Sequence, residues 1–374
     1  ALAGWEEATG LEAGAELAWV PAGAGAGGWE AALPEGLPKG LAEEAAATGS
    51  GRTLFRPAAR RLCERLRGWA APAPAPTPSA EERRLLLDGA AGAGKSVLLA
   101  QAALWARSQG WLVLYVPSAS ALMGGGRYFE VEGGAGSKEG EGGEGGGAEE
   151  EEEDPPSMWD TPGSAARVLD GLASAHGELL GGLGRRVPEA EWAGLAGGGE
   201  GAFAKSKTLG DVLQAGRGSP ELAVPAVLLL FSELMRVGED PGAPPVLAAV
   251  DEYNALFSRT EYMEAVSDVE LAGIPPHHLR LAAALRWLEH PAPVRGGVLC
   301  ATSASVGARG VALPNPGRAR ELVSGYSEEE TRAVLQRYAD RGLLEDAPSY
   351  EMVRGAHAMA AGSGTDLRSL AGWL

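Results

Sequence analysis

The feature that most constrains this chain is a glycine loop at residues 89–96, Gly-Ala-Ala-Gly-Ala-Gly-Lys-Ser. It satisfies the pattern G-x-x-x-x-G-K-[ST]. The glycines of this pattern let backbone N–H groups turn inward around a β-phosphate, and the next helix presents its positive N-terminus. We therefore expect Lys95 to bridge β- and γ-phosphate oxygens and the Ser96 hydroxyl to bind Mg²⁺. The predicted nucleotide-binding residues of the loop are Gly89, Ala90, Ala91, Gly92, Ala93, Gly94, Lys95, Ser96 and Val97.

The flanking residues supply the context that the motif demands, which matters in a chain with 56 glycines. Residues 84–87 are a short apolar strand running into the loop, and residues 95–109 are helical up to Gly110. Residues 111–116, WLVLYV, are a second buried strand. Strand, loop, helix and strand make one βαβ unit and predict an α/β fold with a parallel sheet. Further strands are predicted at residues 246–250 and 297–301, and helices at residues 162–180, 219–237, 277–289, 327–342 and 365–374.

Acidic and hydroxyl side chains follow the third and fourth predicted strands. The segment VLAAVDE at residues 246–252 is typical of a Walker B strand, so Asp251 is expected to hold Mg²⁺ through water. Glu252 is the candidate catalytic residue, expected to polarise an attacking water. Thr302 and Ser303 take the place of a polar γ-phosphate sensor in AAA-like ATPases. No N-K-x-D motif occurs, so the residues leave ATP and GTP both open.

The net charge of −18 argues at first against a nucleic-acid partner, but the charge is concentrated. Residues 132–154 hold ten acids against one lysine, which accounts for half of the excess. A local basic stripe lies before the glycine loop. A stripe of this kind is either a solvated helix face or a surface for RNA phosphates. Its members are Arg52, Arg56, Arg60, Arg61, Arg65 and Arg67.

Several functional classes receive no support from the residues. The longest apolar run, residues 222–231, is too short to span a bilayer, so we expect no membrane partner. Cys63 and Cys300 form no disulfide framework and are expected to be small buried residues. The five histidines show no metal-ligand spacing, and surface or capping roles are expected for them. The acidic first 50 residues lack the arginine-rich character of a transit peptide, so localisation is not read from them.

Composition divides the chain into successive regions. Residues 1–50 are predicted to be a weakly structured N-terminal extension, and residues 51–80 a basic amphipathic segment with a Pro-Ala linker. Residues 81–320 are predicted to form the nucleotide-binding domain. Within it, residues 131–157 are a Gly/Glu low-complexity insertion that we expect to be disordered. Residues 321–374 are predicted to form a small C-terminal helical piece.

Several blocks of sequence, taken in order, resemble the family of death-associated protein 3, a GTP-binding protein of the mitochondrial small ribosomal subunit. The most specific is VDEYNAL, followed by Arg259 and Thr260. The resemblance runs from about residue 50 to the end, and the insertion at residues 131–157 departs from it. The other blocks are LFRPAARRLCERL, WLVLYVPSA, MWDTPGSAARVL, TLGDVL, GGVLCATSAS, VSGYSEEE and DLRSLAGWL.

The resemblance implies a P-loop NTPase domain of the AAA/STAND-like type with a C-terminal helical lid. It also implies a mitochondrial matrix protein that holds GTP or GDP as a structural ligand and contacts ribosomal RNA and neighbouring ribosomal proteins. Two alternatives stay open at this point: a soluble AAA- or STAND-type ATPase switch, and a replication-initiator-type ATPase that binds DNA. Arg309 is the one candidate arginine finger for the switch.

Overall fold

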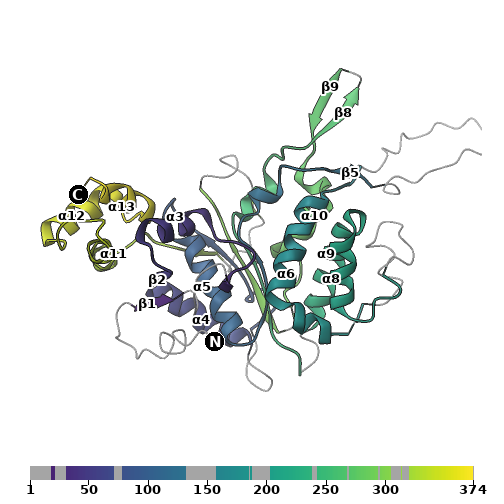
Figure 1. The fold of residues 1–374 in the computed structure, drawn as a ribbon, viewed down its shortest axis with the longest axis horizontal. Coiled ribbons are helices and arrows are strands. Elements are labelled where there is room, and N and C mark those ends of the chain that lie inside the picture. The colour runs from purple at the N-terminus through teal and green to yellow at the C-terminus, as the bar shows by residue number, and fades with distance from the viewer. Residues whose placement is uncertain are drawn as a thin grey trace, which may run out of the picture.

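The computed structural model places a parallel β-sheet at the centre of the chain, with helices on both faces (Figure 1). It describes residues 18–21, 31–70, 78–131, 157–184, 186–187, 203–237, 242–267, 269–293, 295–304, 313 and 320–373. The linker at residues 71–77, most of the acidic insertion and Arg309 lie outside the described residues.

The central sheet has five parallel strands in the order β11-β3-β10-β7-β4. Four of them are the predicted strands, with bounds within one residue of those expected. The fifth, β11, was not predicted. The five strands are β3 (Arg84–Asp88), β4 (Leu112–Val116), β7 (Val246–Val250), β10 (Gly296–Ala301) and β11 (Arg320–Leu322).

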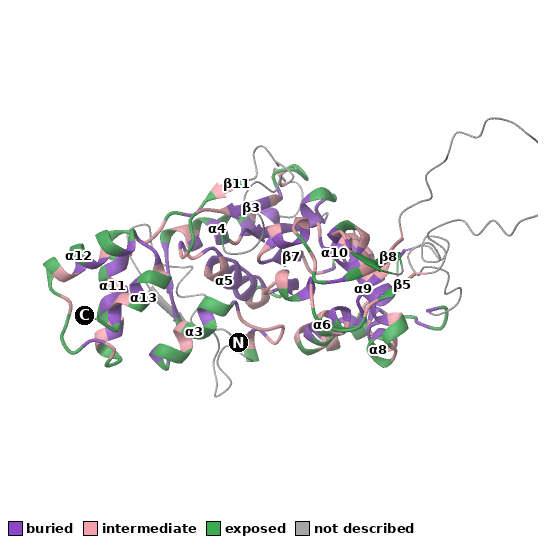
Figure 2. Ribbon diagram, turned by 90° about the horizontal axis from the view of Figure 1, so that it is seen from above, coloured by how far each residue is buried: buried purple, intermediate pink, exposed green. Residues whose placement is uncertain are grey.

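Each sheet face is covered by its own set of helices, which explains why the inner strands are apolar throughout. Along β7, Val246, Ala248 and Val250 join one hydrophobic cluster, while Leu247 and Ala249 join the other. The first cluster packs under α6 (Pro162–Gly182), α8 (Leu209–Gly218), α9 (Pro220–Val237) and α10 (Arg280–Ala284). The second packs under α3 (Lys39–Thr48), α4 (Pro57–Trp69) and α5 (Lys95–Ser108). Figure 2 shows the buried residues concentrated at these interfaces.

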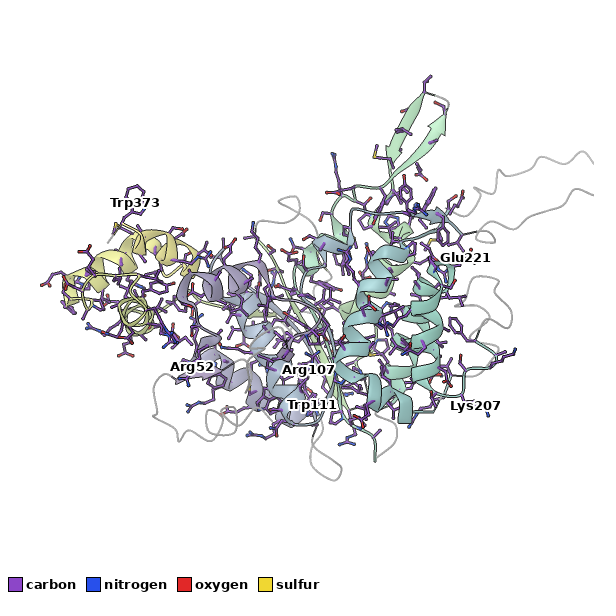
Figure 3. The ribbon with its side chains drawn as sticks, viewed as in Figure 1. Arg52, Arg107, Trp111, Lys207, Glu221 and Trp373 are labelled. Carbon is purple, nitrogen blue, oxygen red and sulfur yellow. The ribbon has the colours of Figure 1, made fainter. Side chains whose placement is uncertain are left out.

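Three C-terminal helices form a separate small cluster beside this core (Figure 1). They are α11 (Glu328–Asp340), α12 (Tyr350–Ala360) and α13 (Gly364–Ala371). Ser327 and Glu330 form the capping box that starts α11, as the run of acids after Ser327 suggests. Leu54 from the N-terminal side packs into the same cluster. Trp373 lies exposed on the upper side of this cluster in Figure 3.

Besides the additional strand β11, the structure differs from the sequence predictions in two places. Residues 31–50 are not weakly structured: Leu33 and Leu41 are buried in the core, and β1 (Ala18–Pro21) pairs with β2 (Arg52–Phe55). The expected helix at residues 277–289 is broken into 3₁₀ turns η3 (Pro276–His278) and η4 (Trp287–Glu289) on either side of α10. Packing explains the break, because the Trp287 ring lies edge-on to Phe231 with centroids 4.9 Å apart.

Short strands complete the described part of the chain. The strands β5 (Phe129–Glu130) and β6 (Trp159–Asp160) pair where the chain leaves and rejoins the body around the acidic insertion. A hairpin of β8 (Met263–Ser267) and β9 (Glu270–Gly273) follows η2 (Tyr253–Phe257) and projects away from the sheet (Figure 1).

Candidate nucleotide site

The glycine loop joins β3 directly to α5, as the sequence predicts. Gly89, Gly92 and Gly94 all adopt positive φ angles, of 146°, 70° and 94°. Residues with a side chain rarely take these angles, so the glycines are needed for the turn. Two of them also lie too close to their neighbours for a Cβ: it would come within 2.4 Å of the Val323 carbonyl at Gly89, and within 2.1 Å of the Ser363 hydroxyl at Gly92. The loop is therefore a close-packed turn at the N-terminus of α5, a form that could act as a cradle for phosphate.

Lys95 lies in the cradle and is 6% exposed. Its ammonium donates to the carbonyls of Gly89 and Ala90, at 2.7 and 2.8 Å. Burial lowers the pKa of Lys95, and the nearby carboxylates of Asp88 and Asp251 oppose that shift. A cation held at the loop by its own carbonyls is placed to bind an anion there.

Asp251 follows the last residue of β7 and lies next to the start of α5. It is 2% exposed, and the Ser96 side chain hydrogen-bonds to it. Burial raises the pKa of Asp251 to about 7. A buried carboxylate beside a hydroxyl fits Mg²⁺, because the cation would offset the cost of the buried charge. In the described residues no three His, Cys, Asp or Glu side chains cluster as a metal site, but Mg²⁺ bound to phosphates keeps water ligands and needs few from the protein.

The raised pKa of Asp251 leads to a prediction for Mg²⁺–nucleotide binding. The folded protein holds a proton on Asp251 up to about pH 7, whereas the unfolded chain loses it near the ordinary aspartate pKa of 3.8. Without ligand, this group therefore destabilises the fold progressively as pH rises through that window. Bound Mg²⁺ favours the ionised form, so binding should release a proton and weaken by about tenfold per pH unit below 7. Calorimetry in two buffers of different ionisation enthalpy measures the release, which should disappear in Asp251→Asn; equal heats for the wild type would contradict it.

Glu252 lies beside Asp251 but is held by the next strand. Its carboxylate accepts hydrogen bonds from Ser118, at 2.5 Å, and from Ser120. Both serines follow the carboxyl end of β4. The Glu252 backbone has φ of 57°, which is uncommon for a residue with a side chain, and its N–H donates to Asp251 Oδ1 at 2.9 Å. Glu252 is thus close to the site, with two hydroxyls bound to one of its carboxylate oxygens, Oε2.

Thr302 and Ser303 lie at the carboxyl end of β10, between the glycine-loop strand and the strand of Asp251. Thr302 donates to Asp88 Oδ1 at 2.7 Å. Burial opposes ionisation of Asp88, but the hydrogen bonds from Thr302 and from the Gly89 N–H lower its pKa overall. Ser303 exchanges hydrogen bonds with the Asn254 amide, through its N–H at 2.8 Å and its carbonyl at 3.0 Å. The predicted residues of the three strands therefore come together at one edge of the sheet.

Arg56 connects the glycine loop to the C-terminal helices. The first residue before α4, it is 6% exposed and donates to the Ala93 carbonyl at 2.8 Å. The same guanidinium binds both carboxylate oxygens of Glu330, at 2.9 and 3.0 Å, and the carbonyls of Ser324 and Gly325. It also lies 4.8 Å from the centre of the Tyr326 ring. Arg56 is therefore not part of a solvated stripe, although Arg52, Arg61, Arg65 and Arg67 of the same stripe are exposed.

A second contact joins the loop to the last helix. The N–H of Gly364, the first residue of α13, donates to the Gly92 carbonyl at 2.9 Å. The two loop carbonyls of Gly92 and Ala93 are thus bound by groups from opposite ends of the chain. A ligand that changes the position of this loop would therefore act on α4 and on the C-terminal helices at the same time.

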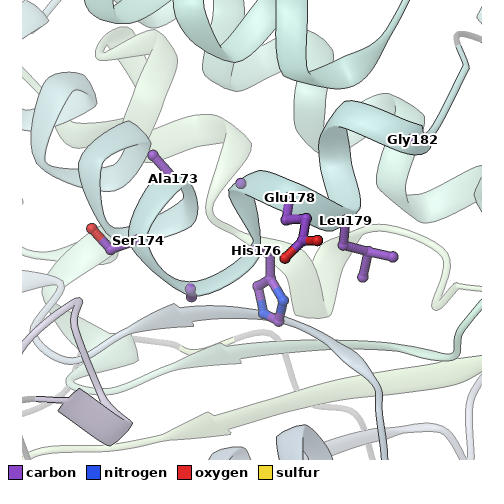
Figure 4. Close-up of a pocket in the computed structure, with 8 residues that line it drawn as sticks. Ala173, Ser174, His176, Glu178, Leu179 and Gly182 are labelled. Atoms are coloured by element: carbon purple, nitrogen blue, oxygen red, sulfur yellow. The ribbon is translucent and has the colours of Figure 1, made fainter.

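A surface cavity of about 590 Å³ lies elsewhere, along α6 (Figure 4). Its lining comes from residues 173–179 and 182 of that helix alone, without any residue of the glycine loop. His176 is the buried member and accepts a hydrogen bond from the Val113 N–H of edge strand β4, at 3.1 Å. Burial lowers the pKa of His176 to about 4. The expectation of a surface or capping role is therefore wrong for His176, which completes the edge of the sheet, whereas Cys63 and Cys300 are buried and free as predicted.

The sequence reasoning missed several residues of the site, and some of them left a signal. Ser118 and Ser120 follow a predicted strand, so the parallel-sheet hypothesis places them at the same edge as Asp251. The local pattern distinguishes Arg56 only as one cation among six. The contacts of Gly92 with Ser363 and Gly364 join residues about 270 positions apart, and the local sequence pattern does not predict them.

The chain is an α/β protein with a parallel sheet, a glycine loop between β3 and α5, and an aspartate at the end of β7. These three features are compatible with the P-loop NTPase class. Comparison with protein families matches the chain to the model of mitochondrial ribosomal death-associated protein 3 over residues 74–133 and 149–314, which is more than half of its length. The chain belongs to this family and is therefore a mitochondrial ribosomal protein of the small subunit. The gap in the match falls within the acidic insertion.

A search of curated proteins gives no match to the chain. Of the helices in the described residues, none is both long and apolar enough to cross a bilayer.

Proposed function

We propose that this chain is a structural, nucleotide-binding component of the mitochondrial small ribosomal subunit that takes part in translation. GTP or GDP with Mg²⁺ is its resident ligand, and ATP is the alternative that the residues leave open. The cradle of residues 89–97 would hold the phosphates, Lys95 would bridge them, and Ser96 and Asp251 would hold Mg²⁺, the latter through water. Thr302 and Ser303 would face the γ-phosphate position. Strand order supports the AAA-like assignment, because β10 lies between the strands of the cradle and of Asp251.

One observation carries the structural role. The cradle carbonyls of Ala93 and Gly92 are bound by Arg56 and by the N–H of Gly364. A ligand that orders the cradle therefore also stabilises α4 and the three C-terminal helices, which act as a lid. Ribosomal RNA is proposed to contact the exposed arginines of α4.

Sedimentation tests the ribosomal role of this chain. A tagged copy expressed in mitochondria should migrate with small subunits in a sucrose gradient. Migration with small subunits is expected to persist after a high-salt wash, as for an integral component. If the tagged protein is found only in a free pool at the top of the gradient, the proposal fails.

Slow hydrolysis is expected, because Glu252 is held by Ser118 and Ser120. Replacing both serines with alanine frees the carboxylate toward the site, and we expect turnover by the isolated protein to rise by about tenfold, below the roughly 10²–10⁴-fold that a fully positioned general base contributes. The added Glu252→Gln change should abolish that gain. Single-turnover hydrolysis of labelled GTP and of ATP measures both. Unchanged turnover in the serine variant would show that the hydroxyls do not restrain Glu252.

The same contacts weigh against the ATPase-switch alternative, in which Glu252 must orient water. Arg309, its candidate finger, lies outside the described residues. Rapid ATP turnover by the wild-type protein would favour this alternative.

A further inference from the structure

The hairpin of β8 and β9, here called the hairpin arm (residues 263–273), takes no part in the nucleotide site. Its base is firmly held. Tyr262 and Ile274 are buried at 3% and 1% exposure, and the N–H of Ile274 donates to the Tyr262 carbonyl at 2.9 Å. Tyr128 packs on the Tyr262 ring and donates to the Met263 carbonyl at 2.5 Å. The arm beyond this base projects away from the body (Figure 1).

The arm carries an exposed apolar face. In the register of β8 and β9, Met263 pairs with Gly273 and Ala265 with Leu271, so these side chains share one face. Met263 is 41% exposed and Leu271 64%. Val269, at the turn, is 97% exposed. A two-stranded hairpin is marginal in water when nothing covers it, and exposed apolar patches mark interaction surfaces.

The charge of the arm distinguishes between RNA and protein as its partner. The described residues of the arm include Glu264 and Glu270 and no lysine or arginine. RNA binding depends on cations that neutralise phosphates, so an acidic arm repels RNA. A protein surface with an apolar cleft and a rim of lysine or arginine is complementary both to the face and to the acids.

We propose that the hairpin arm docks into an apolar, basic-rimmed surface of another protein of the ribosomal particle. This inference rests on the proposed function, because the particle supplies the partner. Along the chain, the arm follows Asp251 and η2. The proposed docking surface and the nucleotide site therefore lie on consecutive segments of the chain.

The test compares matched glutamate substitutions in the full-length tagged protein. Val269→Glu with Leu271→Glu alters the arm, and Met359→Glu alters a side chain of α12 that is 62% exposed and lies outside it. We expect the arm variant to fall at least tenfold in small-subunit or whole-ribosome fractions and the control to match the wild type. Because all three side chains are exposed, the purified variants should melt at the wild-type temperature. Glu264→Lys with Glu270→Lys should also lower incorporation; a gain would indicate RNA and overturn the inference.

A photo-reactive residue at position 269, activated in purified ribosomal particles, identifies the occupant. One protein adduct with lysine or arginine in the crosslinked peptide supports the inference. An adduct with RNA, with a second copy of this chain or with its own acidic insertion overturns it. If wild-type protein is in the particles but the arm variant incorporates equally and forms no adduct, the docking inference alone fails. If the wild type is itself absent from the particles, the proposed function fails.

Discussion

Replacing Arg56 with alanine is expected to lower the free energy of unfolding by about 3–5 kcal/mol, as does breaking other buried ion pairs. The reason is that Glu330 would remain buried without its partner, since both side chains are at most 10% exposed. The Ala93, Ser324 and Gly325 carbonyls would lose a charged donor as well. The effect should be largest at the C-terminal helices, so limited trypsin digestion should release α11–α13 well before the core.

The matched control is Arg65→Ala on α4, the helix that Arg56 directly precedes. Arg65 pairs with Glu321 at 3.2 Å, but the two side chains are 46% and 26% exposed, so its loss should cost about 0–1 kcal/mol. Denaturant unfolding of both variants gives the comparison. Equal stability and equal protease resistance of the two would refute the role of Arg56 as the link between the loop and the lid.

Lys95→Ala is expected to remove nucleotide-dependent stabilisation. A ligand at a thousand times its Kd stabilises the folded state by about 4 kcal/mol, and the variant should lose most of this. The substitution also removes two charged hydrogen bonds to the Gly89 and Ala90 carbonyls, which contributes about 1–3 kcal/mol without ligand. The informative quantity is therefore the rise in melting temperature on adding GDP and Mg²⁺, measured separately for each variant.

Lys205→Ala is the control, because Lys205 is an exposed lysine remote in sequence from the loop. It should retain the full nucleotide-dependent rise. The Lys95 variant should also enter small subunits poorly. Without bound nucleotide the C-terminal helices would be held less firmly against the loop, so the surface that contacts the ribosome would differ. Should it assemble normally and respond to GDP like the wild type, the nucleotide would not be a structural ligand.

The central strands could be predicted because each contains a continuous apolar run that ends at a glycine, a proline, an acid or, for β10, a threonine. For β7 the predicted and observed bounds are the same, and Asp251 and the glycine loop meet as the parallel sheet requires. The edge strand β11 has no such run, and Leu322 within it is 75% exposed. An edge strand depends on its one neighbour for pairing, so composition gives little sign of it.

Long-range contacts explain what the sequence did not predict. The buried role of Arg56 depends on Glu330, 274 residues later, and its neighbours in the stripe are exposed arginines. The N-terminal residues Leu33 and Leu41 are isolated in an Ala- and Gly-rich segment, yet they complete the cluster under α5. In both cases the partner, and not the local pattern, decides whether a residue is buried.

The nucleotide content of small subunits that contain this chain tests the central claim most directly. Particles captured through a tag on the chain would be washed free of loose nucleotide and denatured, and the released nucleotide identified and counted against the chain. We predict one nucleotide per chain, guanine in base, present with the wild type and missing when Lys95→Ala particles can be recovered. Particles that hold the wild-type chain without stoichiometric nucleotide would contradict the account.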